Sequence, residues 1–190
     1  MGQPQARTEH YTYADYLGWP EDTRYELIDG VAYAMAPAPT RSHQLVTGEL
    51  FRQIASTLKG SPCHTFVAPF DVRLPRAGEA DAAVDTVVQP DVLVVCDPAK
   101  VDERGVRGAP DWVGEVLSPA SAGRDQTVKL AAYERAGVPE VWLLHPTDRV
   151  LTIYRLEGNR YGRPTVLEMK GRVAIGVLPE VVVDFALFTE

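Results

Sequence analysis

The chain has 190 residues, of which 45% are apolar, and a formal net charge of −7 at pH 7. This length and composition predict one globular domain over residues 1–190 and exclude disorder for most of the chain. No apolar run approaches the roughly 20 residues of a membrane span. The negative charge argues against a large passive nucleic-acid-binding surface, but it is compatible with a small basic patch beside an acidic metal site.

The N-terminal residues suggest a tail, a short helix and a hairpin. We expect residues 1–10 to be flexible, and they lack the apolar core of a signal peptide, which predicts a cytoplasmic protein. A short helix is expected at residues 13–17. Apolar runs at 25–28 and 31–35 flank Asp29-Gly30, and this dipeptide between apolar runs predicts a β-hairpin.

A long helix and a long strand are expected next. Thr40 can cap a helix over residues 40–58, in which apolar residues recur every four positions. Residues 63–74 alternate between apolar and polar, which predicts a single strand buried mainly on one face. The small, polar and charged segments 76–87 and 98–110 predict exposed hairpin loops.

The central stretch predicts the order strand, strand, helix, strand. Residues 92–95 and 113–117 are apolar runs of strand length. Residues 123–136 read as a helix that ends at Gly137, and 140–144 is another buried strand. Short connections between the three middle strands predict antiparallel neighbours, whereas the helix can cross over to a parallel strand.

The C-terminal residues predict a second hairpin and a docked tail. Residues 150–156 and 161–167 flank Gly158-Asn159, which is a second hairpin signal. The apolar segment 173–188 is expected to pack back on the domain. Runs of strands separated by few helices favour an α+β fold with a mixed sheet over a doubly wound one.

The two cysteines give no positive signal. Cys63 and Cys96 match neither the spacing of a metal site nor a disulfide framework. We therefore expect two reduced, buried thiols.

Two predicted strands carry an acidic residue at a position where burying an apolar residue would cost less free energy. Asp91 follows Pro90 at the entrance to the strand 92–95, and Glu115 interrupts the apolar strand 113–117. A buried carboxylate requires a cation, a hydrogen-bond partner or a proton. These two acids are therefore the first candidates for a functional site.

Four segments carry a resemblance to a known family. In chain order they are YELIDGVAYAM, QPDVLVV, GEVLSP and KLAAYERAGVPEVWLL. Together they resemble the Uma-two family, named as restriction endonucleases, within the PD-(D/E)xK nuclease superfamily. The resemblance implies a restriction-endonuclease-like fold with its core at about residues 40–146, and hairpins added at both ends.

The resemblance also implies a metal-dependent reaction. Asp91 and Glu115 could hold Mg²⁺, or Mn²⁺, with the carbonyl of Val116 as a third ligand, because these ions prefer oxygen ligands and retain waters. A bound metal would polarise the phosphate and lower the pKa of a water. The third position of the (D/E)xK tripeptide is Leu117, so the family pattern points to Lys129 on the following helix as the catalytic lysine.

Other residues are expected to support the site. The family pattern has an acid at Glu26 and often a histidine at His43, and Gln89 could contact a phosphate or a water ligand. Asp125 is a weaker candidate because an i,i+4 pair with Lys129 often only stabilises a helix surface. Tyr133 continues that spacing and could equally belong to the core.

These observations predict an endonuclease that hydrolyses DNA phosphodiester bonds. Cleavage of both strands favours a homodimer, and exposed hairpin edges are compatible with one. The first alternative is a catalytically silent nuclease-fold module for interaction or dimerisation. A second alternative is a hydrolase that uses the same acids on RNA or on a small molecule.

Overall fold

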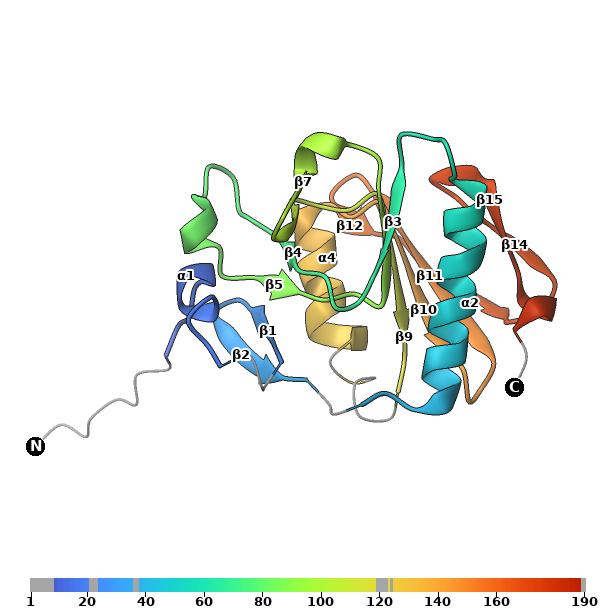
Figure 1. Cartoon of the computed structure of the whole chain (residues 1–190). Coiled ribbons are helices and arrows are strands. Elements are labelled where there is room, and N and C mark those ends of the chain that lie inside the picture. Colours follow the sequence, from blue (N-terminus) through green and yellow to red (C-terminus); the bar gives the residue numbers. More distant parts are fainter. Residues whose placement is uncertain (1–8, 21–23, 36–37, 119–122, 124, 189–190) are drawn as a thin grey trace, which may run out of the picture.

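A computed structural model describes residues 9–20, 24–35, 38–118, 123 and 125–188. Its centre is a mixed seven-stranded sheet with the main order β12-β11-β10-β9-β6-β3, in which β13 also pairs with β11 (Figure 1). The strands are β3 (His64–Val67), β6 (Val92–Val95), β9 (Trp112–Val116), β10 (Glu140–His145), β11 (Val150–Glu157), β12 (Arg160–Tyr161) and β13 (Thr165–Glu168).

The pairing within this sheet confirms the predicted α+β fold. β3, β6 and β9 are antiparallel neighbours, and β10 lies parallel to β9. The crossover between β9 and β10 contains a π-helical turn (Asp125–Lys129) and α4 (Leu130–Ala136). The helix ends at Gly137, whose φ of 84° lies in the left-handed region that glycine adopts most easily.

A long helix covers one face of the sheet. α2 (Arg41–Thr57) begins where the side chain of Thr40 accepts a hydrogen bond from the His43 amide. Its buried Leu50 and Ile54 pack on the sheet. β14 (Arg172–Ile175) and β15 (Leu178–Asp184) form a hairpin that also packs against α2, followed by a 3₁₀ turn (Phe185–Leu187). The predicted docking of the C-terminal tail is therefore confirmed.

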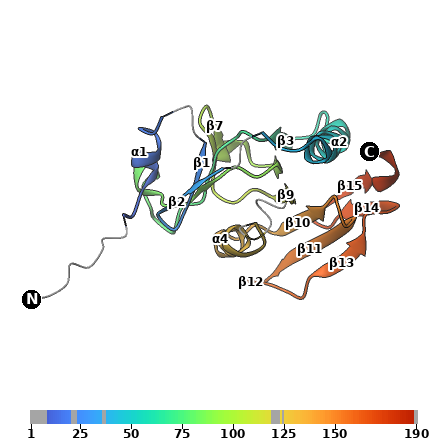
Figure 2. The same cartoon turned by 90° about the horizontal axis from the view of Figure 1, so that it is seen from below.

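A second sheet lies on the side of α4. Its order is β2-β1-β5-β4-β8-β7, and Figure 2 shows it beside the central sheet with α1 (Tyr13–Tyr16) at its outer end. Its strands are β1 (Tyr25–Ile28), β2 (Val31–Ala34), β4 (Val72–Arg73), β5 (Val87–Val88), β7 (Val101–Asp102) and β8 (Gly105–Arg107). The β1–β2 pair is the hairpin predicted from Asp29-Gly30.

The prediction of one strand over 63–74 is wrong. β3 ends at Val67, and Pro69 follows, which has no N–H group for the ladder. Residues 72–73 then join the second sheet, where Arg73 is buried and pairs with Asp81 and Asp102. The chain therefore changes sheets at a position where the apolar alternation continues.

The two predicted exposed loops also contain structure. Residues 84–88 are buried, and they include β5. Residues 98–110 include the β7–β8 hairpin. The segment 84–88 is buried because Val84 and Val87 pack with Tyr13 and Leu27 in a small apolar cluster.

The prediction of two reduced, buried thiols is wrong as well. Cys63 and Cys96 form a disulfide, and neither residue is fully buried. His64 pairs with Val95 in the antiparallel β3–β6 ladder, so the next residues outward are the two cysteines. The strand pairing, which the sequence spacing does not reveal, brings the sulfur atoms together.

Among the described helices, none combines the length and the apolar character that crossing a membrane requires.

Candidate active site

The two acids predicted from the sequence lie in one cavity. β6 and β9 are antiparallel and Val92 pairs with Gly114, so Asp91 and Glu115 occupy neighbouring positions on the two strands. Both line a cavity of about 330 Å³ between these strand ends, α2 and β1. Oδ2 of Asp91 accepts a hydrogen bond of 2.8 Å from the Val116 amide, which fixes the carboxylate against the end of β9.

Glu115 is almost completely buried and contacts the polar groups of Lys129 and Tyr133. Its Oε1 atom lies 2.6 Å from Nζ of Lys129 and accepts a hydrogen bond of 2.5 Å from the Tyr133 hydroxyl. Only 2% of the Glu115 side chain and 3% of the Lys129 side chain are exposed. A buried carboxylate is costly without such partners, so Lys129 and Tyr133 stabilise its charged form.

Lys129 bridges two acids from different sheets. Its Nζ atom is also 2.9 Å from Oε1 of Glu26 on β1. Lys129 is the last residue of the π-helical turn, and Tyr133 follows one turn later on the same face of α4. The side chain predicted to replace the missing strand lysine therefore contacts the strand acid directly. The side chain of Asp125 lies outside the described residues.

Gln89 connects the cavity to a second polar cluster. The backbone N–H of Gln89 donates a hydrogen bond of 2.9 Å to Oε1 of Glu26. Its carboxamide donates to Asp71 at 2.8 Å and to the Tyr16 hydroxyl at 3.2 Å, and it accepts from Arg24. The Gln89 side chain therefore joins α1 to the rim of the cavity, an arrangement that the sequence does not predict.

His43 faces Asp91 from the first turns of α2. Its Nε2 atom is 3.2 Å from Oδ2 of Asp91, and its Nδ1 atom is 3.4 Å from the Thr47 hydroxyl. Both side chains are partly buried, with 12% of His43 and 19% of Asp91 exposed. The structure thus brings together Asp91, Glu115, Lys129, Glu26, His43 and Gln89 around one cavity.

The sequence did not decide whether Tyr133 contacts the site or belongs only to the core. Tyr133 is fully buried in the apolar cluster under α4 and also donates to Glu115. Burial, and next the charge of Glu115, hold the pKa of Tyr133 well above its ordinary value of 10.0. The hydroxyl therefore remains a neutral donor at physiological pH. The sequence feature that indicated this contact was the four-residue spacing between Lys129 and Tyr133.

The oxygen atoms present suit a hard divalent cation. Across the residues the structure describes, no three His, Cys, Asp or Glu side chains group as a ready-made metal site. Mg²⁺ does not need such a cage, because it commonly binds one or two carboxylates and keeps several waters. Asp91 lines the cavity, and both its hydrogen bond from the Val116 amide and its 3.2 Å contact with His43 use Oδ2, so they do not occupy Oδ1. This oxygen is therefore available as a ligand.

Comparisons with known proteins agree on one family. The profile of the Uma2 family, described as "Putative restriction endonuclease", matches residues 13–186. A search of curated proteins gave no match. A solved structure of "a putative nuclease belonging to DUF820" from Anabaena variabilis superposes with a TM-score of 0.73 at 22% identity. The match covers 93% of this chain and 96% of that one, which shows a shared fold. Because the family profile covers nearly the whole sequence, the chain belongs to the Uma2 family.

Proposed function

We propose that the protein is a divalent-metal-dependent endonuclease that hydrolyses phosphodiester bonds in DNA. The observation that carries this proposal is the contact of 2.6 Å between Lys129 and Glu115, beside Asp91 in one cavity. Two carboxylates and a lysine are the groups that a phosphodiesterase site of this kind requires. The family description, "Putative restriction endonuclease", supports the same reaction class.

Asp91, Glu115 and the Val116 carbonyl would hold Mg²⁺ or Mn²⁺. When bound, the metal supplies Lewis-acid polarisation of the phosphate and lowers the pKa of a coordinated water. The Val116 amide and Nε2 of His43 both contact Oδ2 of Asp91, at 2.8 Å and 3.2 Å. These contacts would hold the carboxylate in place before the metal binds, which lowers the cost of binding.

Lys129 would act on the water and on the charge that develops during attack. Its ammonium, which Glu115 and Glu26 hold at the cavity, would donate to the attacking oxygen. A cation held in a nearly dry site stabilises developing negative charge more strongly than it would in water. Tyr133 keeps Glu115 oriented through its hydrogen bond of 2.5 Å.

Cleavage of both DNA strands would need two such sites. A homodimer could supply them, and we include it in the proposal because each chain carries one cavity of this kind among its described residues. The oligomeric state can be measured by analytical ultracentrifugation with and without DNA.

The test is single-turnover cleavage of a supercoiled plasmid by wild type and by Asp91→Asn. The carboxamide oxygen of the variant can still accept from the Val116 amide, so the variant should fold while cleavage falls by about 10²-fold or more. EDTA should abolish cleavage by the wild type. Asp97→Asn is the matched control, because Asp97 lies at the other end of β6 and only caps a 3₁₀ turn. Equal cleavage by both variants would contradict the proposal.

A further inference from the structure

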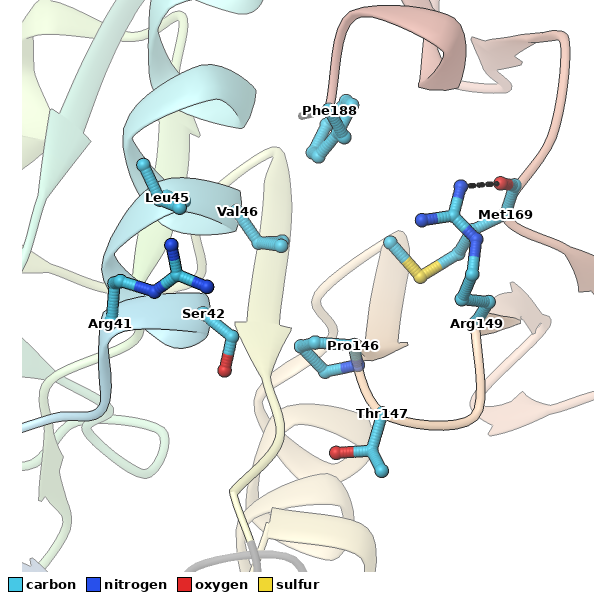
Figure 3. Close-up of a pocket in the computed structure, with 9 residues that line it drawn as sticks. All are labelled: Arg41, Ser42, Leu45, Val46, Pro146, Thr147, Arg149, Met169 and Phe188. Carbon is cyan, nitrogen blue, oxygen red and sulfur yellow. Dashed lines mark hydrogen bonds between the residues drawn. The ribbon is translucent and has the colours of Figure 1, made fainter. Parts of the chain in front are cut away.

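A second cavity lies on the other side of α2 from the candidate active site. It measures about 250 Å³ and is lined by the start of α2, the loop between β10 and β11, Met169 and Phe188 (Figure 3). Met169 and Phe188 are largely buried, and the lining also includes the apolar side chains of Leu45 and Val46. We call this space the Arg41–Arg149 cavity, after the two charged residues in its lining.

The charge of this cavity is opposite to that of the chain. The protein has 26 acidic residues and 19 lysines and arginines, yet none of the nine described residues that line the cavity is acidic. Arg41 comes from α2 and Arg149 from the opposite wall (Figure 3). Neither guanidinium forms an ion pair with a carboxylate of a described residue. Their positive charge is therefore not neutralised locally.

Arg149 is held in place with most of its donors still available. Its φ of 53° is unusual for a residue other than glycine. Its carbonyl accepts from the Met169 amide at 2.8 Å, and its Nη2 atom donates to the Met169 carbonyl at 3.0 Å. A guanidinium carries five N–H donors, so this bond leaves the others for a ligand. The Arg41 side chain makes no hydrogen bond with another described residue.

The two cavities share one edge of the central sheet. β9 and β10 are parallel, so Ser118 after β9, in the active-site cavity, and Pro146 after β10, in this one, follow strand ends at the same edge. Arg41 and Leu45 face one cavity, whereas His43 and Thr47 face the other across the same helix. A strand of nucleic acid that crosses the active site can therefore continue over α2.

We propose that the Arg41–Arg149 cavity binds a backbone phosphate of the substrate strand, next to the proposed nuclease site. Guanidinium groups bind phosphate oxygens in a bidentate geometry, which two arginines from opposite walls can supply. The apolar lining would pack against the adjoining sugar. A helix is about 10–12 Å across, so this phosphate lies within a few nucleotides of the cleaved bond.

The proposed phosphate subsite rests on the proposed nuclease function, and the following experiment tests the subsite separately from the nuclease activity. Binding of a short DNA duplex is measured in EDTA, without cleavage, over a series of salt concentrations. Arg149→Ala and Arg41→Ala should each weaken binding about tenfold, because charge-assisted hydrogen bonds are lost. Each should also reduce the slope of log affinity against log salt by about 1. Arg163→Ala removes the same charge from an exposed residue outside both cavities and should match wild type.

A second series locates the phosphate. Duplexes that carry one uncharged methylphosphonate each are bound to wild type and to Arg149→Ala. At one position within a few nucleotides of the cut site, the neutral linkage should weaken binding by the wild type and abolish the difference between the two proteins. If both arginine variants bind like Arg163→Ala, the subsite is overturned, although Asp91-dependent cleavage would still stand. Arginine-dependent binding without cleavage in Mg²⁺ would support the subsite and contradict the nuclease proposal.

Discussion

At the scale of single residues, the site contains buried acidic side chains that are paired with a buried lysine. Nζ of Lys129 lies 2.9 Å from Glu26 and 2.6 Å from Glu115. Removing one partner of a buried pair typically costs about 3–5 kcal/mol, because the remaining charge stays in a poorly solvating environment. The same cost keeps the lysine at a fixed position, which a group that assists a reaction requires.

Replacing Tyr133 should change both the free energy of unfolding and its dependence on pH. Tyr133→Phe should lower the free energy of unfolding by about 1–3 kcal/mol, because Glu115 loses a buried donor. The raised pKa means that above pH 10.0 the folded protein keeps a proton that the unfolded chain loses. Stability therefore falls as pH rises above that value, and the variant should show a shallower fall.

The measurement is urea denaturation of wild type and Tyr133→Phe between pH 7 and pH 11. The pKa values of Tyr16 and Tyr161 are also raised, mainly by burial, so some alkaline loss remains in the variant. Tyr154→Phe is the control, because Tyr154 is only partly buried on β11. Identical alkaline slopes for all three proteins would contradict the raised pKa of Tyr133.

At the scale of elements, α2 positions residues for both cavities. Thr40 accepts from the His43 amide at 3.3 Å and begins the helix. Thr40→Ala should reduce the free energy of unfolding by about 1 kcal/mol, since the first turn loses its cap. Thr40→Ser keeps the hydroxyl and should retain most of the stability. Thermal unfolding of the three proteins checks this, and an Ala variant as stable as the Ser variant would show that the cap contributes nothing.

Elements with strong local signals were predictable from the sequence. The four-residue period of Leu50 and Ile54 predicted α2, Asp29-Gly30 predicted the first hairpin, and Gly137 predicted the end of the crossover helix. The crossover also placed Lys129 near Glu115, because the helix leads from β9 to its parallel neighbour. These features depend on local periodicity and turn chemistry, which a single sequence contains.

Features that depend on tertiary pairing were not predictable. Apolar alternation runs through Pro69, so it could not show that β3 and β4 belong to different sheets. The Cys63–Cys96 disulfide follows from the register of β3 against β6. The network of Gln89 with Asp71 requires three segments to meet. In each case the cause is a contact between residues distant in the chain.

At the scale of the whole molecule, the site is assembled where the two sheets meet. Glu26 comes from the second sheet, Asp91 and Glu115 from the central one, and Lys129 from the crossover between its parallel strands. α2 supplies His43 from the opposite side. Because the crossover brings Lys129 to Glu115, this lysine can take the place of a lysine at position 117, where the chain has Leu117. This replacement is the central claim of the proposed mechanism.

A double variant that keeps the wild-type formal charge, compared with the single variant from which it differs only at Lys129, makes that claim testable. Lys129→Met alone would leave two buried carboxylates without their cation, so it is combined with Glu26→Gln. The formal charges of Glu26, Glu115 and Lys129 add up to −1, and the double variant keeps that formal sum. Glu26→Gln alone retains the lysine and its contact of 2.6 Å with Glu115. Circular dichroism and Mg²⁺ titration establish that both variants are folded and bind the metal.

The deciding measurement is the single-turnover rate of plasmid cleavage in Mg²⁺ by these two variants. We predict that Glu26→Gln with Lys129→Met cleaves about 10²-fold or more slowly than Glu26→Gln alone, on the scale of removing one transition-state charge stabiliser. Equal rates from two folded, Mg²⁺-binding proteins would contradict the account, because another group would then activate the water.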